Sequence, residues 1–255
     1  MKTISLVRIS SRDKPPPLAL CARPTGLSMS PVKKQIIVIS TLLAVLIFLP
    51  AIAKAQNAYV KGGNIFFQSG PSKTPIQLTS SGKDDQPSLS PDKKEIVFIR
   101  HTPGKTIEAG LGPAEATELW IIGVDGKRAT RLVTGRPAAK MNEVLADIRS
   151  PQFSPDSKRI YFLSAAWVTS GAVHVVDLGT GSEHFVCPGN SLEVLEKGRY
   201  AGHLLISQHR YFLAGGSYDW IWLFTPNGKE VGPVVDADSD YEERLEEFRK
   251  TNTPE

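Results

Sequence analysis

The chain has 255 residues, of which 41% are hydrophobic and 22% are charged, and it contains only two cysteines. This composition is typical of a globular protein and excludes a disordered, collagen-like or disulfide-built chain. The net charge of +4 comes from residues 1–55, which hold eight basic residues and one acidic residue. The rest of the chain has 22 basic and 25 acidic residues, so the charge pattern predicts no nucleic-acid binding.

The first predicted element is a secretory signal peptide over residues 29–55. Lys33-Lys34 precede an uncharged apolar run, and the small residues Ala53 and Ala55 stand where a signal peptidase reads the chain. The run is shorter than the roughly 20 residues that span a bilayer as a helix. The pattern therefore favours cleavage after Ala55, and the alternative is an uncleaved N-terminal anchor, which would be the protein's one contact with a membrane.

Residues 1–28 precede this complete signal and carry a proline-rich, basic stretch. We interpret them as a non-native or disordered extension, with translation starting at Met29. The mature chain is then expected to begin at Gln56 in an oxidising compartment. It retains one cysteine, Cys187, beside apolar residues, which predicts a buried thiol and no intramolecular disulfide.

An internal repeat is the most informative feature of the sequence. Residues 87–98 align without gaps to residues 151–162, with seven of twelve positions identical. Each copy contains Ser-Pro-Asp between apolar segments, and in such a turn proline fixes φ while aspartate bonds back to the backbone. The repeat therefore predicts two antiparallel hairpins. A third, weaker copy is expected at residues 204–213, with a shortened turn.

Hairpins of a second kind alternate with these. They have Asn-Gly, Asp-Gly or similar glycine-containing turns between apolar runs, which is a strong hairpin signal. The four predicted hairpins cover residues 64–79, 118–133, 172–186 and 220–235. One hairpin of each kind makes a four-stranded unit, and radially stacked four-stranded sheets are the blades of a β-propeller.

The two Ser-Pro-Asp copies, each with the apolar hairpin that follows, resemble the WD-repeat-like propeller repeat of the TolB family. The resemblance implies an all-β fold over residues 56–235, a β-propeller with about four blade-like units of four antiparallel strands, between a signal helix and a short C-terminal helix. The chain supplies seven hairpins, whereas the family has six or seven blades and a small N-terminal domain. A small or open propeller and a homodimer that completes the blades both remain open. A circular closure, in which residues 64–79 join the last hairpin, is also expected.

Two connections interrupt the alternation of hairpins. Residues 101–117 are rich in glycine and proline, and residues 136–149 are expected to contain a helical turn. Long connections on a rigid scaffold often carry binding groups, so His101 and Lys105 are candidates for an interaction surface. The first connection is interpreted either as a plain solvent loop or as a lid.

Residues 236–255 form an acidic tail. Tyr241, Leu245 and Phe248 are spaced so that they share one face of a short helix. We expect this helix to dock on a blade, and the alternative is a partner-binding peptide.

The sequence contains no Gly-x-Ser-x-Gly, Cys-x-x-Cys or His-Glu-x-x-His motif, and we predict no enzyme, cofactor or metal. His203 and His209 flank one predicted strand and are expected to approach Tyr218 and Asp219. These four residues complete the candidate interaction surface together with Trp220. Three aspartates near the Ser-Pro-Asp hairpins are interpreted as turn-forming residues: Asp84, Asp85 and Asp147.

These features predict an exported, non-enzymatic scaffold in the periplasm of a Gram-negative bacterium. The resemblance to TolB implies that it binds a periplasmic or envelope protein. The alternative is a carbohydrate-binding protein or a propeller enzyme of the lyase or hydrolase type, using the channel face with His203, His209 and Asp219.

Overall fold

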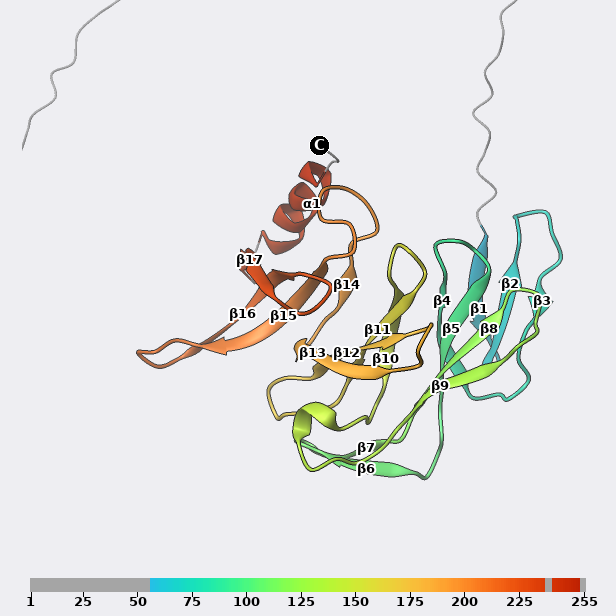
Figure 1. The fold of residues 1–255 in the computed structure, drawn as a ribbon, viewed down its shortest axis with the longest axis horizontal. Coiled ribbons are helices and arrows are strands. Elements are labelled where there is room, and N and C mark those ends of the chain that lie inside the picture. The colour runs from blue at the N-terminus through green and yellow to red at the C-terminus, as the bar shows by residue number, and fades with distance from the viewer. Residues whose placement is uncertain (1–55, 237–239, 253–255) are drawn as a thin grey trace, which may run out of the picture. The chain divides into compact units, whose positions relative to one another are not determined.

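The computed structural model describes residues 56–236 and 240–252, which fall within one compact unit of the chain. β-Strands are the main secondary structure of the described residues, with one α-helix near the C-terminal end (Figure 1). The predicted signal peptide, its cleavage residues Ala53 and Ala55, and residues 1–28 lie outside them. Within the described ranges, no helix is both long and apolar enough to cross a bilayer.

Four antiparallel sheets follow one another along the described chain, one with three strands and three with four. In each of these sheets the strands lie side by side in sequence order, as predicted for a blade. A separate hairpin of β6 (Thr106–Ala109) and β7 (Gly112–Glu115) is inserted in the chain between β5 and β8 of the second sheet. The first sheet contains β1 (Asn57–Lys61), β2 (Asn64–Gln68) and β3 (Ile76–Gln77), and the second β4 (Asp84–Leu89), β5 (Glu95–Arg100), β8 (Glu118–Gly123) and β9 (Thr130–Thr134). The third contains β10 (Arg149–Phe153), β11 (Arg159–Ser164), β12 (Ala172–Asp177) and β13 (Glu183–Pro188), and the fourth β14 (Glu193–Val194), β15 (Leu204–Tyr211), β16 (Ser217–Phe224) and β17 (Glu230–Asp236).

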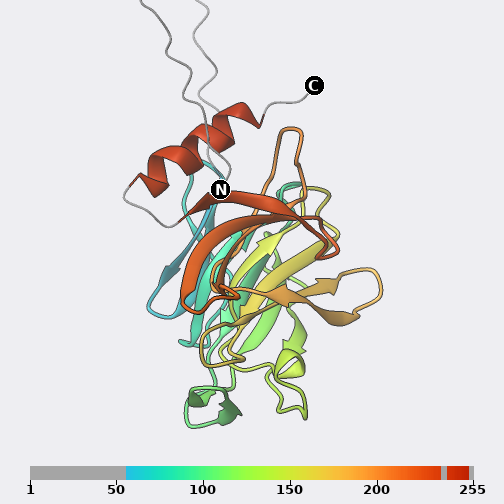
Figure 2. The same cartoon turned by 90° about the vertical axis from the view of Figure 1, so that its left-hand side faces the viewer.

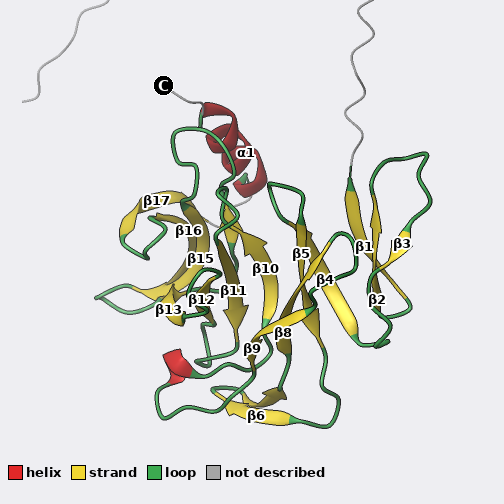
Figure 3. Ribbon diagram, turned by 45° about the vertical axis from the view of Figure 1, so that its right-hand side comes forward, coloured by secondary structure: helices red, strands yellow, loops and turns green. Residues whose placement is uncertain are grey.

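The first strands of successive sheets contact one another, β1 with β4, β4 with β10, and β10 with β14 (Figure 3). Two glutamine side chains join these strands. The Gln86 side-chain oxygen accepts a bond of 2.7 Å from the Ser150 amide, and Gln152 donates to the Leu192 carbonyl over 2.7 Å. Consecutive sheets are therefore connected to one another through their first strands.

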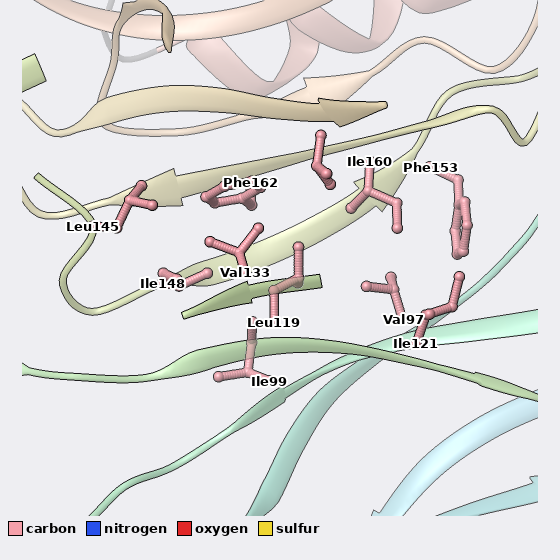
Figure 4. Close-up of a cluster of buried hydrophobic side chains, with 11 residues drawn as sticks. Val97, Ile99, Leu119, Ile121, Val133, Leu145, Ile148, Phe153, Ile160 and Phe162 are labelled. Carbon is pink, nitrogen blue, oxygen red and sulfur yellow. The ribbon is translucent and has the colours of Figure 1, made fainter. Parts of the chain in front are cut away.

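Apolar side chains fill the spaces between consecutive sheets. On β5, Val97 and Ile99 face the third sheet and contact the cluster that includes Phe162 (Figure 4), whereas Ile96 and Phe98 face the first sheet. All five side chains are fully buried. The continuous apolar run in β5 is explained by this burial of both faces, because a strand with one solvated face would alternate with polar residues.

The two predicted Ser-Pro-Asp hairpins are confirmed. In the second, Ser154 Oγ donates to Asp156 Oδ1 over 2.6 Å and accepts from the Arg159 amide over 2.9 Å. Ser90 and Asp92 form the same pair at 2.7 Å in the first copy. These hydroxyl bonds stabilise the carboxylates and lower the pKa of both aspartates.

The four glycine-turn hairpins are also confirmed, as β2–β3, β8–β9, β12–β13 and β16–β17. The expected helical turn in residues 136–149 is a short 3₁₀ helix at Met141–Glu143.

Two predictions about topology are wrong. The expected turn within residues 204–213 is absent, because all eight residues of Leu204–Tyr211 pair with β16 in one continuous strand. On its other side, this strand pairs with the upstream strand Glu193–Val194. The expected circular closure fails because Asn64–Gln68 pairs with β1 and β3 in a sheet of its own. The strand Asn57–Lys61 was not predicted.

The C-terminal helix α1 (Tyr241–Thr251) covers the outer face of the fourth sheet, as the spacing of its apolar residues predicts (Figure 2). Leu245 is buried among side chains of that sheet, and Tyr241 and Phe248 pack beside it. Arg249 anchors the helix through a two-bond contact with Glu193 on β14. These bonds with Glu193 raise the pKa of Arg249.

Candidate functional site

The candidate site is a groove at the end of the sheets where the β6–β7 hairpin lies (Figure 1). It runs between this hairpin and the connection from β11 to β12, residues 165–171, and has a volume of about 470 Å³. A bond of 2.5 Å from the Gly110 amide to the Ala166 carbonyl joins the two walls. The groove is therefore formed by the long connections that follow β5 and β11. The Ser-Pro-Asp turns precede these two strands and lie at their opposite ends.

The hairpin that forms the first wall is docked on the third sheet's connections. Ile107 is buried and packs against Val144 and Ala146, and the Asp147 amide donates to the Glu115 carbonyl over 2.7 Å. The segment that was expected to be either a plain loop or a lid is thus an ordered hairpin, because its one buried isoleucine and its backbone bonds fix it in place.

An ion pair between Asp147 and Arg149, with 2.7 Å between Oδ2 and Nη1, lines the groove. We refer to these two residues as the floor of the groove. Asp147 has a φ of 47° and Ser150 a φ of 53°, a left-handed conformation that costs about 1–3 kcal/mol for a residue with a side chain. Gln86 has a φ of 49° at the equivalent bulge of β4. The Ser-Pro-Asp turns contain the same conformation at Lys93 and Ser157, so it belongs to the repeated bulges and turns and does not by itself distinguish the groove.

The walls expose large apolar side chains to solvent. Leu111 on the hairpin is 81% exposed, and Val168 and Trp167 on the opposite connection are 61% and 36% exposed. Small residues, Ala109 and Ala114 among them, line the space between these walls. Large exposed apolar patches commonly mark interaction sites, and these are the three large exposed apolar side chains that line the groove within the described residues.

Two predicted site residues, His101 and Lys105, lie at the base of the β6–β7 hairpin. His101 Nδ1 is 2.8 Å from Glu115 Oε2, and its Nε2 is 4.0 Å from Asp85 Oδ2. The Lys105 carbonyl accepts from the Ala116 amide over 2.9 Å. The structure places both residues beside the groove, although neither side chain lines it.

The other predicted residues lie on β15 and β16, and the structure brings most of them together. His209 Nδ1 is 3.0 Å from Asp219 Oδ1, since the two residues are paired across the strands. The rings of Tyr218 and Trp220 are 4.7 Å apart on the opposite face of the sheet. The expected approach of His203 is wrong, because it precedes Leu204 at the far end of β15 and contacts the ring of Tyr200.

Aromatic rings form a row on one face of the long β15–β16 hairpin. Phe212 is 4.6 Å from Tyr218, which in turn contacts Trp220. Trp222 continues the row at 6.3 Å, but it is buried and the Arg210 guanidinium lies 3.5 Å above its ring. Only the outer part of this row reaches solvent.

Two further side chains with reactive groups, those of Cys187 and His174, are buried in the structure. Cys187 is buried, and burial raises the pKa of its thiol to about 12. His174 is buried with Nδ1 at 2.6 Å from Glu183, which also accepts a bond from Arg136. Burial raises the pKa of Glu183, but these bonds outweigh it and the pKa is lowered. In the part of the chain that the structure describes, no cluster of three or more potential ligands is arranged for a metal ion.

No family model and no curated protein matches the chain. Solved structures with a similar backbone include TolB and β-propeller proteins at low identity. Dipeptidyl peptidase 4 of Porphyromonas gingivalis is 13% identical, with 71% of this chain and 31% of that chain covered at a TM-score of 0.48. TolB from Acinetobacter baumannii is 15% identical over 69% and 49% at 0.37, and the β-propeller domain of the Trilobed protease from Pyrococcus furiosus is 12% identical over 72% and 58% at 0.45. This chain covers less than two thirds of the length of each.

Part of the groove lies in the two connections that the sequence predicts as carriers of binding groups, residues 101–117 and 136–149, but no motif identifies the individual residues that line it. Asp147 was interpreted as turn-forming, and Arg149, Trp167 and Leu111 belong to segments that share no motif. They meet because the Gly110 amide bonds to a connection more than fifty residues away.

Proposed function

We propose that the protein is an exported, non-enzymatic β-propeller scaffold, and that it binds a polypeptide segment of a periplasmic or envelope protein in the groove. The observation that carries the proposal is the set of exposed apolar side chains on the two walls, Leu111, Trp167 and Val168. The signal-peptide pattern in residues 29–55 supports export.

The groove has the composition of a protein interface. Binding energy in such interfaces is concentrated in a few side chains, among which tryptophan, tyrosine and arginine are enriched, and Trp167 and Arg149 are of these types. The walls are held by backbone bonds before a partner arrives, which limits the entropy lost on binding. Loops on a rigid β-scaffold commonly carry binding residues.

The test is site-specific photo-crosslinking in cells of the source organism. A photoreactive phenylalanine analogue replaces Val168 on the groove wall, and in a matched control it replaces Lys127 in the β8–β9 turn at the other end of β8. We expect a discrete adduct with another polypeptide from position 168 and none from position 127. Equal labelling at both positions, or none at 168, would contradict the proposal, and an adduct of twice the mass would identify a second copy as the partner.

A second candidate function is carbohydrate binding by the row of rings on the β15–β16 hairpin. Phe212 is 51% exposed, and Tyr218 and Trp220 extend the apolar surface from it, an arrangement suited to stacking against the apolar face of a sugar ring. A glycan array probed with the wild-type protein and with the Trp220→Ala variant tests this function. Selective binding that the substitution removes would support it, whereas an array without selective signal would rule it out.

A further inference from the structure

We infer that the groove recognises the free C-terminal carboxylate of a partner polypeptide, with Arg149 as the residue that binds it. This inference rests on the proposed function and specifies the ligand of the same site. It is argued from the donor groups on the floor of the groove, the chemistry of its walls and its size.

One nitrogen of the Arg149 guanidinium donates hydrogen bonds within the protein, and the edge formed by the other two nitrogens donates none to any described residue. Its Nη1 donates to the carboxylate and the carbonyl oxygen of Asp147, over 2.7 and 3.2 Å. Within the described residues, neither Nε nor Nη2 donates a hydrogen bond. The side chain is 31% exposed, and Nη2 lies beside Gly171 on the groove wall. The edge formed by Nε and Nη2 matches a carboxylate, which accepts two parallel bonds from it.

The rest of the groove favours an apolar residue next to that carboxylate. Among the side chains that line it, only Asp147 and Arg149 are ionisable, and Asp147 already pairs with the arginine. Leu111 and Val168 are exposed on opposite walls and are placed to cover an apolar side chain. A positively charged ligand residue would find no free carboxylate among these lining residues.

The dimensions fit the end of a chain. A volume of about 470 Å³ lies in the lower half of the range for small-ligand sites, which suits a few residues and not a long segment. The bond between Gly110 and Ala166 connects the two walls. Asn190 fixes the second wall, since its side chain accepts from the Gly171 amide and donates to the Thr169 carbonyl over 2.9 and 3.0 Å.

The test uses an array of random heptapeptides, each synthesised both with a free C-terminal carboxylate and as the C-terminal amide, and probed with the purified full-length protein. We expect peptides that end in Leu, Ile, Val or Phe to bind as acids, with affinity at least about tenfold lower for the amides. Arg149→Gln should remove the difference between acid and amide. Asp147→Asn, which keeps the arginine but weakens its ion pair, should preserve the difference and controls for changes in the floor. Lys127→Gln, in a turn away from the groove, should change nothing.

The outcomes separate this inference from the proposed function. If acids and amides bind equally and Trp167→Ala abolishes both, the groove binds polypeptides and the carboxylate inference is overturned. If no peptide binds in either form, both are overturned. An acid preference that survives Arg149→Gln, in a variant with an unchanged unfolding midpoint, would contradict the assignment to Arg149.

Discussion

The second and third sheets have the same kind of turn at one end and different connections at the other. At one end, the turns at Ser90–Lys94 and Ser154–Lys158 repeat the same hydroxyl–carboxylate contacts. At the other end, β5 continues into a docked hairpin and β11 into residues 165–171, which have no counterpart in each other. The repeated end closes the hairpins through these contacts, while the other end exposes large apolar side chains. Non-glycine residues with positive φ occur at both ends. Under the proposed function, the repeated end stabilises the sheets and the opposite end of the same strands binds the partner.

The largest effect is expected in the core that both ends share. Phe162→Ala removes a fully buried ring between the second and third sheets and should lower the free energy of unfolding by about 3–5 kcal/mol. Urea denaturation followed by tryptophan fluorescence measures this change. Phe212→Ala, at an exposed hairpin tip, is the control and should cost less than 1 kcal/mol. Similar losses for the two variants would contradict the assignment of the core.

The next effect concerns the docking of the β6–β7 hairpin. Ile107→Ala should destabilise the protein by about 2 kcal/mol, because Ile107 is buried against the third sheet's connection. Leu111→Ala on the same hairpin removes an exposed side chain and should leave the unfolding midpoint unchanged. If Ile107→Ala has no effect, the hairpin is a free lid and not a fixed wall.

At the repeated end, Ser154→Ala should cost about 1–2 kcal/mol, because the Arg159 amide loses its acceptor and Asp156 loses one of its two donors. Ser90→Ala should behave alike in the first copy. Neither substitution should alter ligand binding in the groove. A change in binding would show that the two ends are coupled.

The same turns predict a dependence of stability on pH. The pKa values of Asp92 and Asp156 are lowered in the folded state by the serine hydroxyls, so the folded protein binds fewer protons than the unfolded chain. This contribution is complete above about pH 5 and is lost as the pH falls through the unfolded and then the folded pKa values. Thermal unfolding between pH 2.5 and 6 should show the loss, and Ser154→Ala should reduce its slope. If stability depends on pH with the same slope in Ser154→Ala and in the wild type, the hydroxyl bond is not the cause of the pH dependence.

The smallest effect is expected for the buried thiol. With its pKa raised to about 12, Cys187 should not react with a disulfide reagent at pH 8 in the folded protein and should react fully in denaturant. The measurement requires a Cys21→Ser background, so that only one thiol is present. Rapid reaction without denaturant would show that β13 opens in the native state.

Most of the sheet structure could be predicted because turn chemistry is local. The two Ser-Pro-Asp copies and the glycine turns each determine a hairpin by backbone conformation and short-range bonds, and the structure confirms all six. The prediction failed at residues 204–213, where apolar residues without a proline were aligned to a repeat, although they continue as the strand Leu204–Tyr211.

Two connections that line the groove, residues 101–117 and 136–149, were predicted as candidate binding segments, but their meeting with residues 165–171 could not be predicted, because it depends on tertiary contacts. Asp147 and Arg149 stand before and at the start of β10, Leu111 lies on an inserted hairpin and Trp167 lies on a later connection. On the β15–β16 hairpin, in contrast, strand pairing alone places His209 beside Asp219, and this proximity was predicted. Sequence patterns thus located the contacts that a strand pair determines, and not those that depend on the packing of separate sheets.

The most direct test of the difference between the two ends is hydrogen–deuterium exchange of the full-length protein with and without the polypeptide captured by crosslinking. The account predicts that ligand slows exchange in residues 106–115 and 165–171, while exchange at Ser90–Lys94 and Ser154–Lys158 does not change. Protection at the Ser-Pro-Asp turns, with none along the groove, would contradict it.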